Sequence, residues 1–260
     1  MTYGAGVVPE SMRNVKAFLY DVFGTIVDLR TTITQELTSF ATLTSTRCSI
    51  NSQLSSKNWS EFSQKWRLLS TKRIQQSLLG LEPFRTIDEI NREILFSLIQ
   101  EFDLPQYVWS DDEMDQLNLV WHRLDCYDDC VKGLSKLSKK YLNATLSNAN
   151  VRLLVDLKRH NGLHMLDYMF SAELFKEFIP KKSTYLGACK MLNLDPSEVV
   201  MVSSHYSDLL NSKELGLRTV YVRREKSNYF NNNIEYNEYN NEEFDWVVDN
   251  LEELAEIMGC

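Results

Sequence analysis

The residues of this sequence that could do chemistry stand where short apolar runs end in polar side chains. Asp21 ends the run Ala17–Asp21, Ser147 and Asn148 follow 141–146, and Ser203, Ser204 and His205 close the run that begins at Val199. A carboxylate can act as a nucleophile or as a base, and hydroxyl, amide and imidazole groups can supply the hydrogen bonds that such chemistry needs. These three points therefore indicate a hydrolytic site.

The elements that must position these side chains are buried strands separated by amphipathic helices. We expect strands at 17–21, 141–146, 168–171, 199–203 and 219–222, with an edge strand at 246–248, and helices at 151–159, 183–192, 208–215 and 251–258. This alternation predicts an α/β fold with a parallel sheet covered on both faces. Ligands of such sheets bind at the carboxyl ends of the strands, where the polar residues stand.

The segment between the first strand and the rest of the sheet is different, because it shows helical periodicity without strands. Amphipathic runs cover 59–79, 87–102 and 111–124. We therefore predict a core of residues 1–30 and 125–260, and an all-helical cap of residues 31–124 that covers the strand ends. Residues 226–243, rich in Asn, Tyr and Glu, predict a surface loop.

Composition and charge narrow the class of partner. The chain has 260 residues, a formal charge of -8 and no apolar stretch long enough to cross a bilayer, so we expect neither a membrane nor a nucleic-acid partner. The first 16 residues predict a short cytosolic leader, and five scattered cysteines suit a reducing compartment. A pair formed by Cys126 and Cys130 is the weaker alternative to a packing role for both. Small molecules acted on in the cytoplasm are the expected partner class.

Asp21 is the strongest candidate for a catalytic group. It is followed by a turn that contains Gly24, so backbone N–H groups of Val22 and Phe23 are expected to face the carboxylate or its reaction intermediates. An aspartate at such a place could equally be a turn or capping residue. The neighbouring motifs favour the catalytic interpretation.

Four segments in order resemble the haloacid dehalogenase superfamily, and in particular its L-2-haloacid dehalogenase branch. They cover most of the chain from about Val15 onward and read DVFGT from Asp21, LSN ending at Asn148, VSSHYSD ending at Asp208, and ELGLRT from Glu214. The resemblance implies a Rossmann-like three-layer core with a helical cap inserted after the first strand. It also makes a homodimer one expected assembly.

Two positions separate the branches of this superfamily. The resemblance implies that a phosphatase would carry a second aspartate two residues after the nucleophile, and this chain has Phe23 there. A phosphatase would also place two acidic residues in the last motif to hold Mg²⁺, and here Ser203 replaces the first and only Asp208 is kept. Halide leaves as a stable anion without a proton, so these replacements favour dehalogenation with no cofactor and no metal.

The resemblance implies a two-step reaction on a short 2-haloalkanoic acid that produces a 2-hydroxy acid. Asp21 attacks the C2 carbon and forms an aspartyl ester, and water then hydrolyses that ester. Asp208 is the candidate for organising the water, and Lys181 and Ser147 are the other expected catalytic groups. For Asp208 the alternative is an N-cap of the helix that it opens.

The expected substrate-binding residues come from both predicted domains. They are Thr25, Arg67, Asn148, Tyr185, Ser203 and His205. Each has an alternative structural role: Ser147 and Asn148 could cap a helix, and an exposed helix arginine would look like Arg67. His205 stands where many dehalogenases have asparagine, and an imidazole can donate and accept as an amide does.

One departure weakens the dehalogenase interpretation. The family places a lysine directly before the proline of its third motif, where this chain has Ile179 followed by Pro180. Lys181 or Lys182 could replace it if the loop is rearranged, or both could be solvated. Two other functions therefore stay open: a binding or regulatory protein that has lost catalysis, and a Mg²⁺-dependent small-molecule phosphatase.

Overall fold

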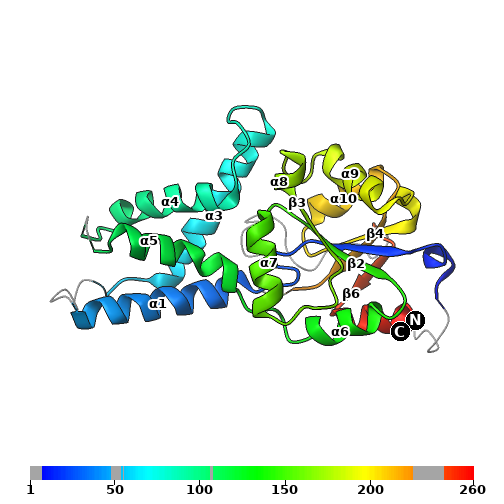
Figure 1. Ribbon diagram of the computed structural model, residues 1–260, viewed down its shortest axis with the longest axis horizontal. Helices are drawn as coiled ribbons and strands as arrows, with labels where there is room; N and C mark the ends of the chain where they lie inside the picture. Colours follow the sequence, from blue (N-terminus) through cyan, green and yellow to red (C-terminus); the bar gives the residue numbers. More distant parts are fainter. Residues whose placement is uncertain (1–7, 48–53, 55, 106–107, 225–242) are drawn as a thin grey trace. The chain divides into compact units, whose positions relative to one another are not determined.

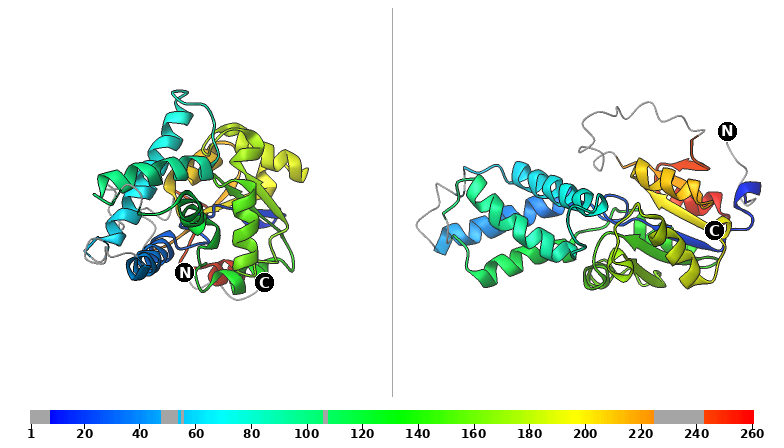
Figure 2. Two further views of the ribbon diagram at one scale, coloured as in Figure 1. Left: turned by 60° about the vertical axis from the view of Figure 1, so that its left-hand side comes forward. Right: turned by 90° about the horizontal axis from the view of Figure 1, so that it is seen from above.

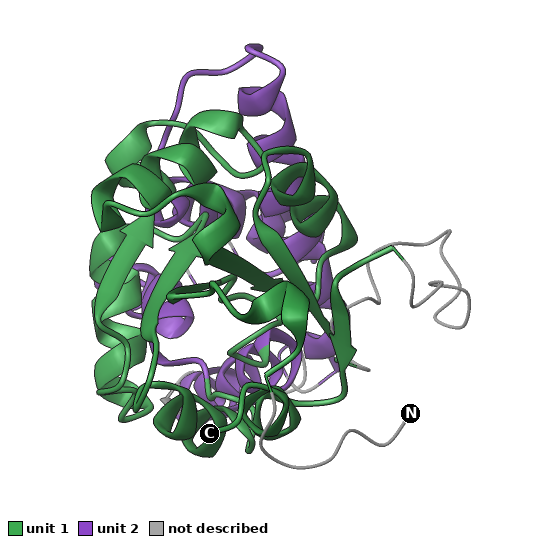
Figure 3. Ribbon diagram, turned by 90° about the vertical axis from the view of Figure 1, so that its right-hand side faces the viewer, with its two compact units in different colours: residues 1–28, 125–260 green, residues 29–124 purple. Residues whose placement is uncertain are grey.

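A computed structural model describes residues 8–47, 54, 56–105, 108–224 and 243–260. Their contacts divide the chain into two compact units, one formed by 1–28 with 125–260 and the other by 29–124 (Figure 3). We call them the core unit and the helical unit. Within the described residues, no helix is long and apolar enough to cross a membrane. Cys48 and most of the predicted 226–243 loop lie outside the described residues.

The core unit is built on a parallel sheet of six strands in the order β3-β2-β1-β4-β5-β6. The strands are β1 (Ala17–Tyr20), β2 (Leu142–Ser147), β3 (Tyr168–Ser171), β4 (Val199–Ser203), β5 (Arg218–Val222) and β6 (Trp246–Val248). Strands β1 and β4 are buried along their whole length, because helices cover both faces of the sheet centre. This explains why they read as continuous apolar runs.

Helices connect these strands, as a parallel sheet requires. They are α6 (Cys130–Leu137), α7 (Val151–His160), α8 (Ala172–Phe175), α9 (Lys182–Leu192), α10 (Tyr206–Glu214) and α11 (Leu251–Ile257), with short 3-10 turns η1 (Glu10–Met12) and η3 (Pro196–Glu198). In Figure 1, α8, α9 and α10 lie on one side of the sheet and α6 lies on the other.

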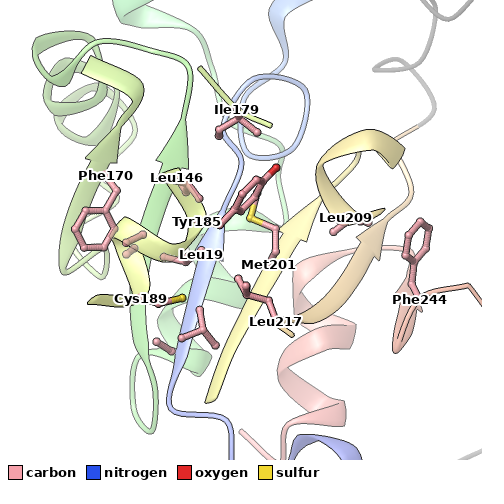
Figure 4. Close-up of a cluster of buried hydrophobic side chains, with 14 of the residues drawn as sticks. Leu19, Leu146, Phe170, Ile179, Tyr185, Cys189, Met201, Leu209, Leu217 and Phe244 are labelled. Atoms are coloured by element: carbon pink, nitrogen blue, oxygen red, sulfur yellow. The ribbon is translucent and has the colours of Figure 1, made fainter. Parts of the chain in front are cut away.

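One face of the sheet packs against α9 and α10. Leu19, Met201 and Leu146 from three adjacent strands meet Tyr185 of α9 and Leu209 of α10 in a single buried cluster (Figure 4). Register explains the selection, since Leu19 is level with Met201 and alternate residues point to the same face. The carboxyl end of this cluster lies directly beneath the candidate site.

On the opposite face, α6 packs closely on α11. A Cβ at Gly133, in the middle of α6, would lie 2.5 Å from Cβ of Leu251. Only glycine fits this position without a shift of one helix. The contact matters for the site because α6 and α11 also anchor Asp129, as described below.

The helical unit contains α1 (Leu29–Arg47), α3 (Trp59–Leu78), α4 (Ile87–Glu101), α5 (Asp111–Asn118) and the 3-10 turn η2 (Leu119–Arg123). Figure 2 shows from two sides that its helices pack on one another. Thr86 and Ser110 begin α4 and α5 with capping boxes, in which a glutamate three residues later bonds back to the cap. Trp66 stacks edge-on against Trp121 in the interior.

The predicted fold class is confirmed, with differences at the ends of elements. The predicted helix 111–124 ends at Asn118 and continues as η2, and the sequence interpretation did not identify α1, α6 or α8. Helix α1 is rich in threonine, a residue type that is more common in strands than in helices. Four threonine hydroxyls of this helix donate to backbone carbonyls of the preceding turn. Helix α10 begins at Tyr206, two residues before the predicted start.

Candidate active site at the carboxyl ends of strands β1 and β4

The candidate site lies where the strand order reverses. Strands β1, β2 and β3 follow one another in one direction, whereas β4 returns to the other side of β1. In an open α/β sheet this switch point leaves a crevice at the carboxyl ends of the two strands. Asp21 follows β1 and Ser203 ends β4, so both stand at this crevice.

Asp21 is held on one side of its carboxylate. Its backbone N–H donates to Val202 O at 3.0 Å, which continues the ladder between β1 and β4. The Thr25 hydroxyl donates to Oδ2 at 2.7 Å, and Nε2 of His205 lies 3.5 Å from the same oxygen. None of the described residues donates to Oδ1. One carboxylate oxygen is therefore fixed and the other is available for chemistry.

Thr25 and Ser204 join the two strand ends through their hydroxyl groups. The Ser204 N–H donates to Thr25 Oγ1 at 2.9 Å, and the Ser204 hydroxyl donates to Gly24 O at 2.7 Å. Both hydroxyl protons are thus used, since that of Thr25 goes to Asp21. Both side chains are fully buried. The orientation of the Thr25 hydroxyl toward the carboxylate is fixed by these bonds.

We call residues 22–27 the nucleophile turn, and four successive carbonyls of this turn accept hydrogen bonds. Phe23 O accepts from His205 Nε2 at 2.8 Å and Gly24 O from Ser204. Thr25 O accepts from Nε of Arg224 at 3.0 Å, and Ile26 O from the Tyr127 N–H at 3.0 Å. These donors come from three separate segments of the chain.

The amide side of the turn is more open. Gly24 has a φ of 81°, which the left-handed region favours for glycine. The N–H groups of Gly24, Thr25, Ile26 and Val27 all bond within the turn, whereas the N–H of Val22 has no acceptor among the described residues. An unpaired N–H beside a reactive carboxylate is a donor available to a developing oxyanion.

At the end of β4, Ser203 connects His205 to Asp208. Its hydroxyl accepts from the His205 N–H at 2.9 Å and donates to Asp208 Oδ2 at 3.3 Å. The alternative role of Asp208 as an N-cap is wrong, because α10 begins at Tyr206 with His205 as N-cap and Asp208 lies within the first turn. A carboxylate there is stabilised by the N-terminal helix dipole.

Tyr185 lies beneath the site with its ring in the core cluster. Its side chain is fully buried, and its hydroxyl donates to the backbone O of Asp208 at 3.3 Å (Figure 4). Burial raises the pKa of this phenol, and the nearby Asp208 and Asp21 carboxylates raise the pKa further. Tyr185 therefore stays neutral and supports the start of α10. Its role toward a substrate stays a prediction.

Ser147 and Asn148 bond to backbone in the structure. Ser147 Oγ accepts from the Ala149 N–H at 3.2 Å. The side-chain amide of Asn148 makes two hydrogen bonds to the backbone of Ile179. Its Oδ1 accepts from the Ile179 N–H at 2.7 Å, and its Nδ2 donates to the Ile179 carbonyl at 3.4 Å. Asn148 thus shapes the loop before Pro180. The predicted donation to a nucleophile or substrate is untested for both residues.

Ile179 and Lys181 differ sharply in environment. Ile179 packs into the core cluster (Figure 4), whereas the Lys181 side chain is exposed. Among the described residues, no hydrogen bond or ion pair involves the Lys181 ammonium group. Neither residue supplies a cation to Asp21 in this arrangement.

Arg67 belongs to the helical unit, so its predicted role toward the substrate stays a prediction. It lies in α3, with its side chain half-buried, one residue after the fully buried Trp66. Its carbonyl accepts from the Thr71 hydroxyl.

Sequence reasoning missed Arg224, which bonds to the nucleophile turn. Two arginines in a row, Arg223 and Arg224, do not by themselves indicate a buried residue. Arg224 is in fact buried at 6% exposure, whereas Arg223 pairs with Asp249 on the surface. The available signal was position, because Arg224 follows a buried strand at the edge where the other site residues stand.

The donors at the site are one carboxylate from each strand end, together with hydroxyl, imidazole and backbone groups. Over the described part of the chain, no group of three or more His, Cys, Asp and Glu side chains is spaced to hold a metal ion. Phe23 is apolar, and the Ser203 hydroxyl is bonded to Asp208. This donor set does not fit the acidic ligand pair that Mg²⁺ prefers.

Comparisons with known proteins place these observations in a family. Residues 15–216 match the model of the haloacid dehalogenase-like hydrolases. (S)-2-haloacid dehalogenase 4A of Burkholderia cepacia is 35% identical over 113 residues, which are 43% of this chain and 49% of that protein. (S)-2-haloacid dehalogenase 1 of Pseudomonas sp. (strain CBS-3) is 26% identical over 217 residues, 82% of this chain and 86% of that protein.

Solved structures agree with the sequence matches. A crystal structure of an L-2-haloacid dehalogenase superposes with a TM-score of 0.79 at 28% identity, covering 94% of this chain and 98% of the other. A second, of a defluorinating L-2-haloacid dehalogenase, gives 0.80 at 26% identity, with 96% and 98% covered.

Proposed function

The chain belongs to the haloacid dehalogenase-like hydrolase family, and from this we propose that it hydrolyses the carbon–halogen bond of short 2-haloalkanoic acids without a metal. The observation that carries the proposal is the state of Asp21. One carboxylate oxygen is held by Thr25, and the other has no donor among the described residues. The four relatives named above are 2-haloacid dehalogenases, and their names support the substrate class.

In the first step, an oxygen of Asp21 attacks C2 of the substrate. A C–O bond forms, and the C–halogen bond breaks with its electron pair leaving on the halide. No proton is needed, which agrees with an apolar Phe23 where an acid would protonate an alcohol leaving group. The Thr25 bond to Oδ2 keeps the carboxylate plane oriented for the attack.

In the second step, water attacks the aspartyl carbonyl carbon and releases the 2-hydroxy acid. The proposed donors to the oxyanion that forms on Asp21 are the N–H of Val22, which has no acceptor among the described residues, and the N–H of Phe23. Asp208 is the proposed group that organises the water and accepts its proton, with Oδ2 bonded to Ser203. The C–O bond between the Asp21 carbonyl carbon and the substrate oxygen breaks, and that oxygen takes up the proton. The water oxygen stays in Asp21, so the first product molecule carries the original carboxylate oxygen.

His205 is the proposed hydrogen-bonding partner on the Asp21 side of the site. An anionic nucleophile and an anionic substrate repel each other, and N–H groups close to the nucleophile reduce that repulsion. Nε2 of His205 donates to Phe23 O at 2.8 Å and lies 3.5 Å from Asp21 Oδ2. We propose that this N–H group supplies part of what Lys181 does not supply in the described arrangement.

Binding of the substrate carboxylate by Arg67 stays a prediction. We propose that the protein has neither a nucleic-acid nor a membrane partner and that it assembles as a homodimer. The four described cysteines carry free thiols, which supports a reducing cytoplasm as the compartment.

The test is halide release from L- and D-2-chloropropionate in excess EDTA. Wild-type protein should release chloride, and Asp21→Asn should lower the rate by about 10⁴-fold or more. A single turnover in ¹⁸O-water should label Asp21 and leave the first product unlabelled. Chloride release that needs Mg²⁺, or turnover of p-nitrophenyl phosphate with Mg²⁺, would contradict the proposal.

A second function is favoured by one observation, the burial of Ile179 and the exposure of Lys181. If neither 2-chloropropionate nor p-nitrophenyl phosphate is turned over, the chain is a binding or regulatory relative. Binding of 2-chloropropionate, measured by calorimetry with wild type and Asp21→Asn, then becomes the deciding experiment.

A further inference from the structure

Arg224 is a buried cation that bonds both to the nucleophile turn and to Asp129. Its Nε donates to Thr25 O at 3.0 Å. Nη1 and Nη2 donate to the two carboxylate oxygens of Asp129 at 2.7 and 3.0 Å. The guanidinium carbon lies 4.2 Å from the ring centroid of Tyr127. One planar group therefore binds a carbonyl, a carboxylate and an aromatic face.

Asp129 makes this arrangement rigid. Besides Arg224, its Oδ2 accepts from the N–H of Leu251, the first residue of α11, at 2.7 Å. It is the residue before α6, whose Gly133 lies against the same Leu251. The ion pair is thus fastened where two helices meet, so the guanidinium has little freedom to move.

We propose that Arg224 is a positioning residue for the reaction: by holding the Thr25 carbonyl, it directs the Thr25 hydroxyl at Asp21. The inference rests on the proposed dehalogenase function. Thr25 carries both groups, so a rotation of its backbone that releases the carbonyl would also turn the hydroxyl away from Oδ2. Arg224 binds the turn from one side, and Ser204 binds it from the other.

Lysine could not replace arginine here. A guanidinium offers Nε, Nη1 and Nη2 in one plane, which matches a carbonyl on one edge and a carboxylate on another, whereas an ammonium is a point charge. Burial lowers the pKa of Arg224, but the bonds to Asp129 together with the charges of Cys130, Asp129 and Tyr127 raise the pKa overall. The guanidinium therefore stays charged at neutral pH.

The first experiment compares Arg224→Met, Arg224→Lys and Arg223→Met. Arg223 is the matched control, because it is the adjacent arginine and its ion pair with Asp249 is at the surface. We expect Arg224→Met to lower kcat for 2-chloropropionate by about 10- to 100-fold with little change in KM, since a misplaced hydroxyl near the reacting atoms is costly. Arg224→Lys should recover little of the loss, and Arg223→Met should match wild type.

The second experiment removes the group that Arg224 is proposed to position. In a Thr25→Val background, Arg224→Met should change kcat less than twofold, while its effect on thermal stability should be the same as in wild type. A purely structural arginine would instead lower kcat by the same factor in both backgrounds, and that additivity would overturn the proposal.

A third measurement does not depend on activity, so failure of the proposed function is distinguishable from failure of this inference. Hydrogen exchange measured by mass spectrometry should show faster exchange in a peptide covering residues 21–27 of Arg224→Met than in Arg223→Met. Unchanged exchange in that peptide would refute the positioning role even if wild type proves to be an active dehalogenase.

Discussion

The nucleophile turn and the interior of the helical unit differ in how completely their buried polar groups are hydrogen-bonded. In the turn, the carbonyls of four successive residues, 23–26, each accept a hydrogen bond. In the helical unit, the fully buried Asn91 has no described partner for either end of its side-chain amide, and the Ser70 hydroxyl has none either. Both groups lie in helices with ordinary apolar neighbours.

The difference shows that complete hydrogen bonding is found where a side chain must be held in a defined position. A buried polar group without a partner lowers stability by about 1–3 kcal/mol, and a folded unit tolerates a few of them. A nucleophile must stay within a fraction of an ångström of its reactive position, so the carbonyls that hold its turn are all bonded, and the N–H of Val22, which has no acceptor among the described residues, is left for the reaction. The helical unit is stabilised by its packing, whereas the turn is positioned by its hydrogen bonds.

Among variants of the nucleophile turn, Thr25→Val has the largest expected effect. It should lower kcat by about 100-fold, because Asp21 Oδ2 loses its hydroxyl donor and the Ser204 N–H loses its acceptor while the side-chain shape is kept. Thr25→Ser, which keeps the hydroxyl, is the control and should stay within about tenfold of wild type. Steady-state kinetics checks both, and a loss in Thr25→Ser as large as that in Thr25→Val would contradict the role of the hydroxyl group.

His205 holds the nucleophile turn through its imidazole. Its Nε2 donates to Phe23 O at 2.8 Å and lies 3.5 Å from Asp21 Oδ2. His205→Ala should lower kcat by about tenfold, because the turn loses a donor beside the nucleophile. His205→Asn, whose amide can donate as the imidazole does, is the control and should lose less. Steady-state kinetics measures both, and an equal loss in the two variants would contradict the role of the donated hydrogen bond.

In the helical unit, replacing an unpartnered group should stabilise the protein. Asn91→Leu removes an amide that has no described partner and keeps the branching of the side chain, so the free energy of unfolding should rise by about 1 kcal/mol. Asn118→Leu is the contrast, because Nδ2 of Asn118 donates to Asp88 O and its loss should destabilise. Urea denaturation measures both. Destabilisation by Asn91→Leu would mean that ordered water satisfies the amide.

The smallest effect should come from the surface ion pairs of the helical unit. Glu93 pairs with Arg85 and Arg73, and the bond to Arg85, followed by that to Arg73, lowers the pKa of Glu93. A carboxyl group whose pKa is lowered by folding stabilises the folded protein at pH values above its ordinary pKa of about 4.3. That stabilisation is lost as the pH falls through the pKa of the folded state.

Glu93→Gln should therefore lower the free energy of unfolding by about 0.2–1 kcal/mol at pH 7 and by less near pH 3. Thermal melts at the two pH values test this. A difference that grows in acid would contradict the assignment of the pKa shift.

Much of the core unit could be predicted from the sequence because its strands are buried on both faces. The runs at 168–171, 199–203 and 246–248 match β3, β4 and β6 at both ends. Helix α1 was missed because its threonines have weak helix propensity, and its tertiary packing overrides that preference. Short helices such as α8 carry too few residues for a periodic signal.

The site residues that could be predicted are those whose position directly after a strand can be recognised in the sequence. Asp21, Ser203 and His205 could be identified because each stands at the carboxyl end of a strand that is apparent in the sequence. Arg224 could not be assigned, because nothing in its local sequence separates it from the exposed Arg223. Nor did the sequence reveal that the Asn148 amide is bonded to Ile179, since those residues meet through the fold.

The central place of β1 also determines when the site can form during synthesis. Asp21 and Thr25 leave the ribosome early, but Ser204 lies 179 residues after Thr25, and Arg224 comes later still. The helical unit is continuous in sequence and can pack before the core unit is complete. Among the residues of the site, the carboxylate is therefore made first, and it is fixed in place only after Ser204 and Arg224 have been made.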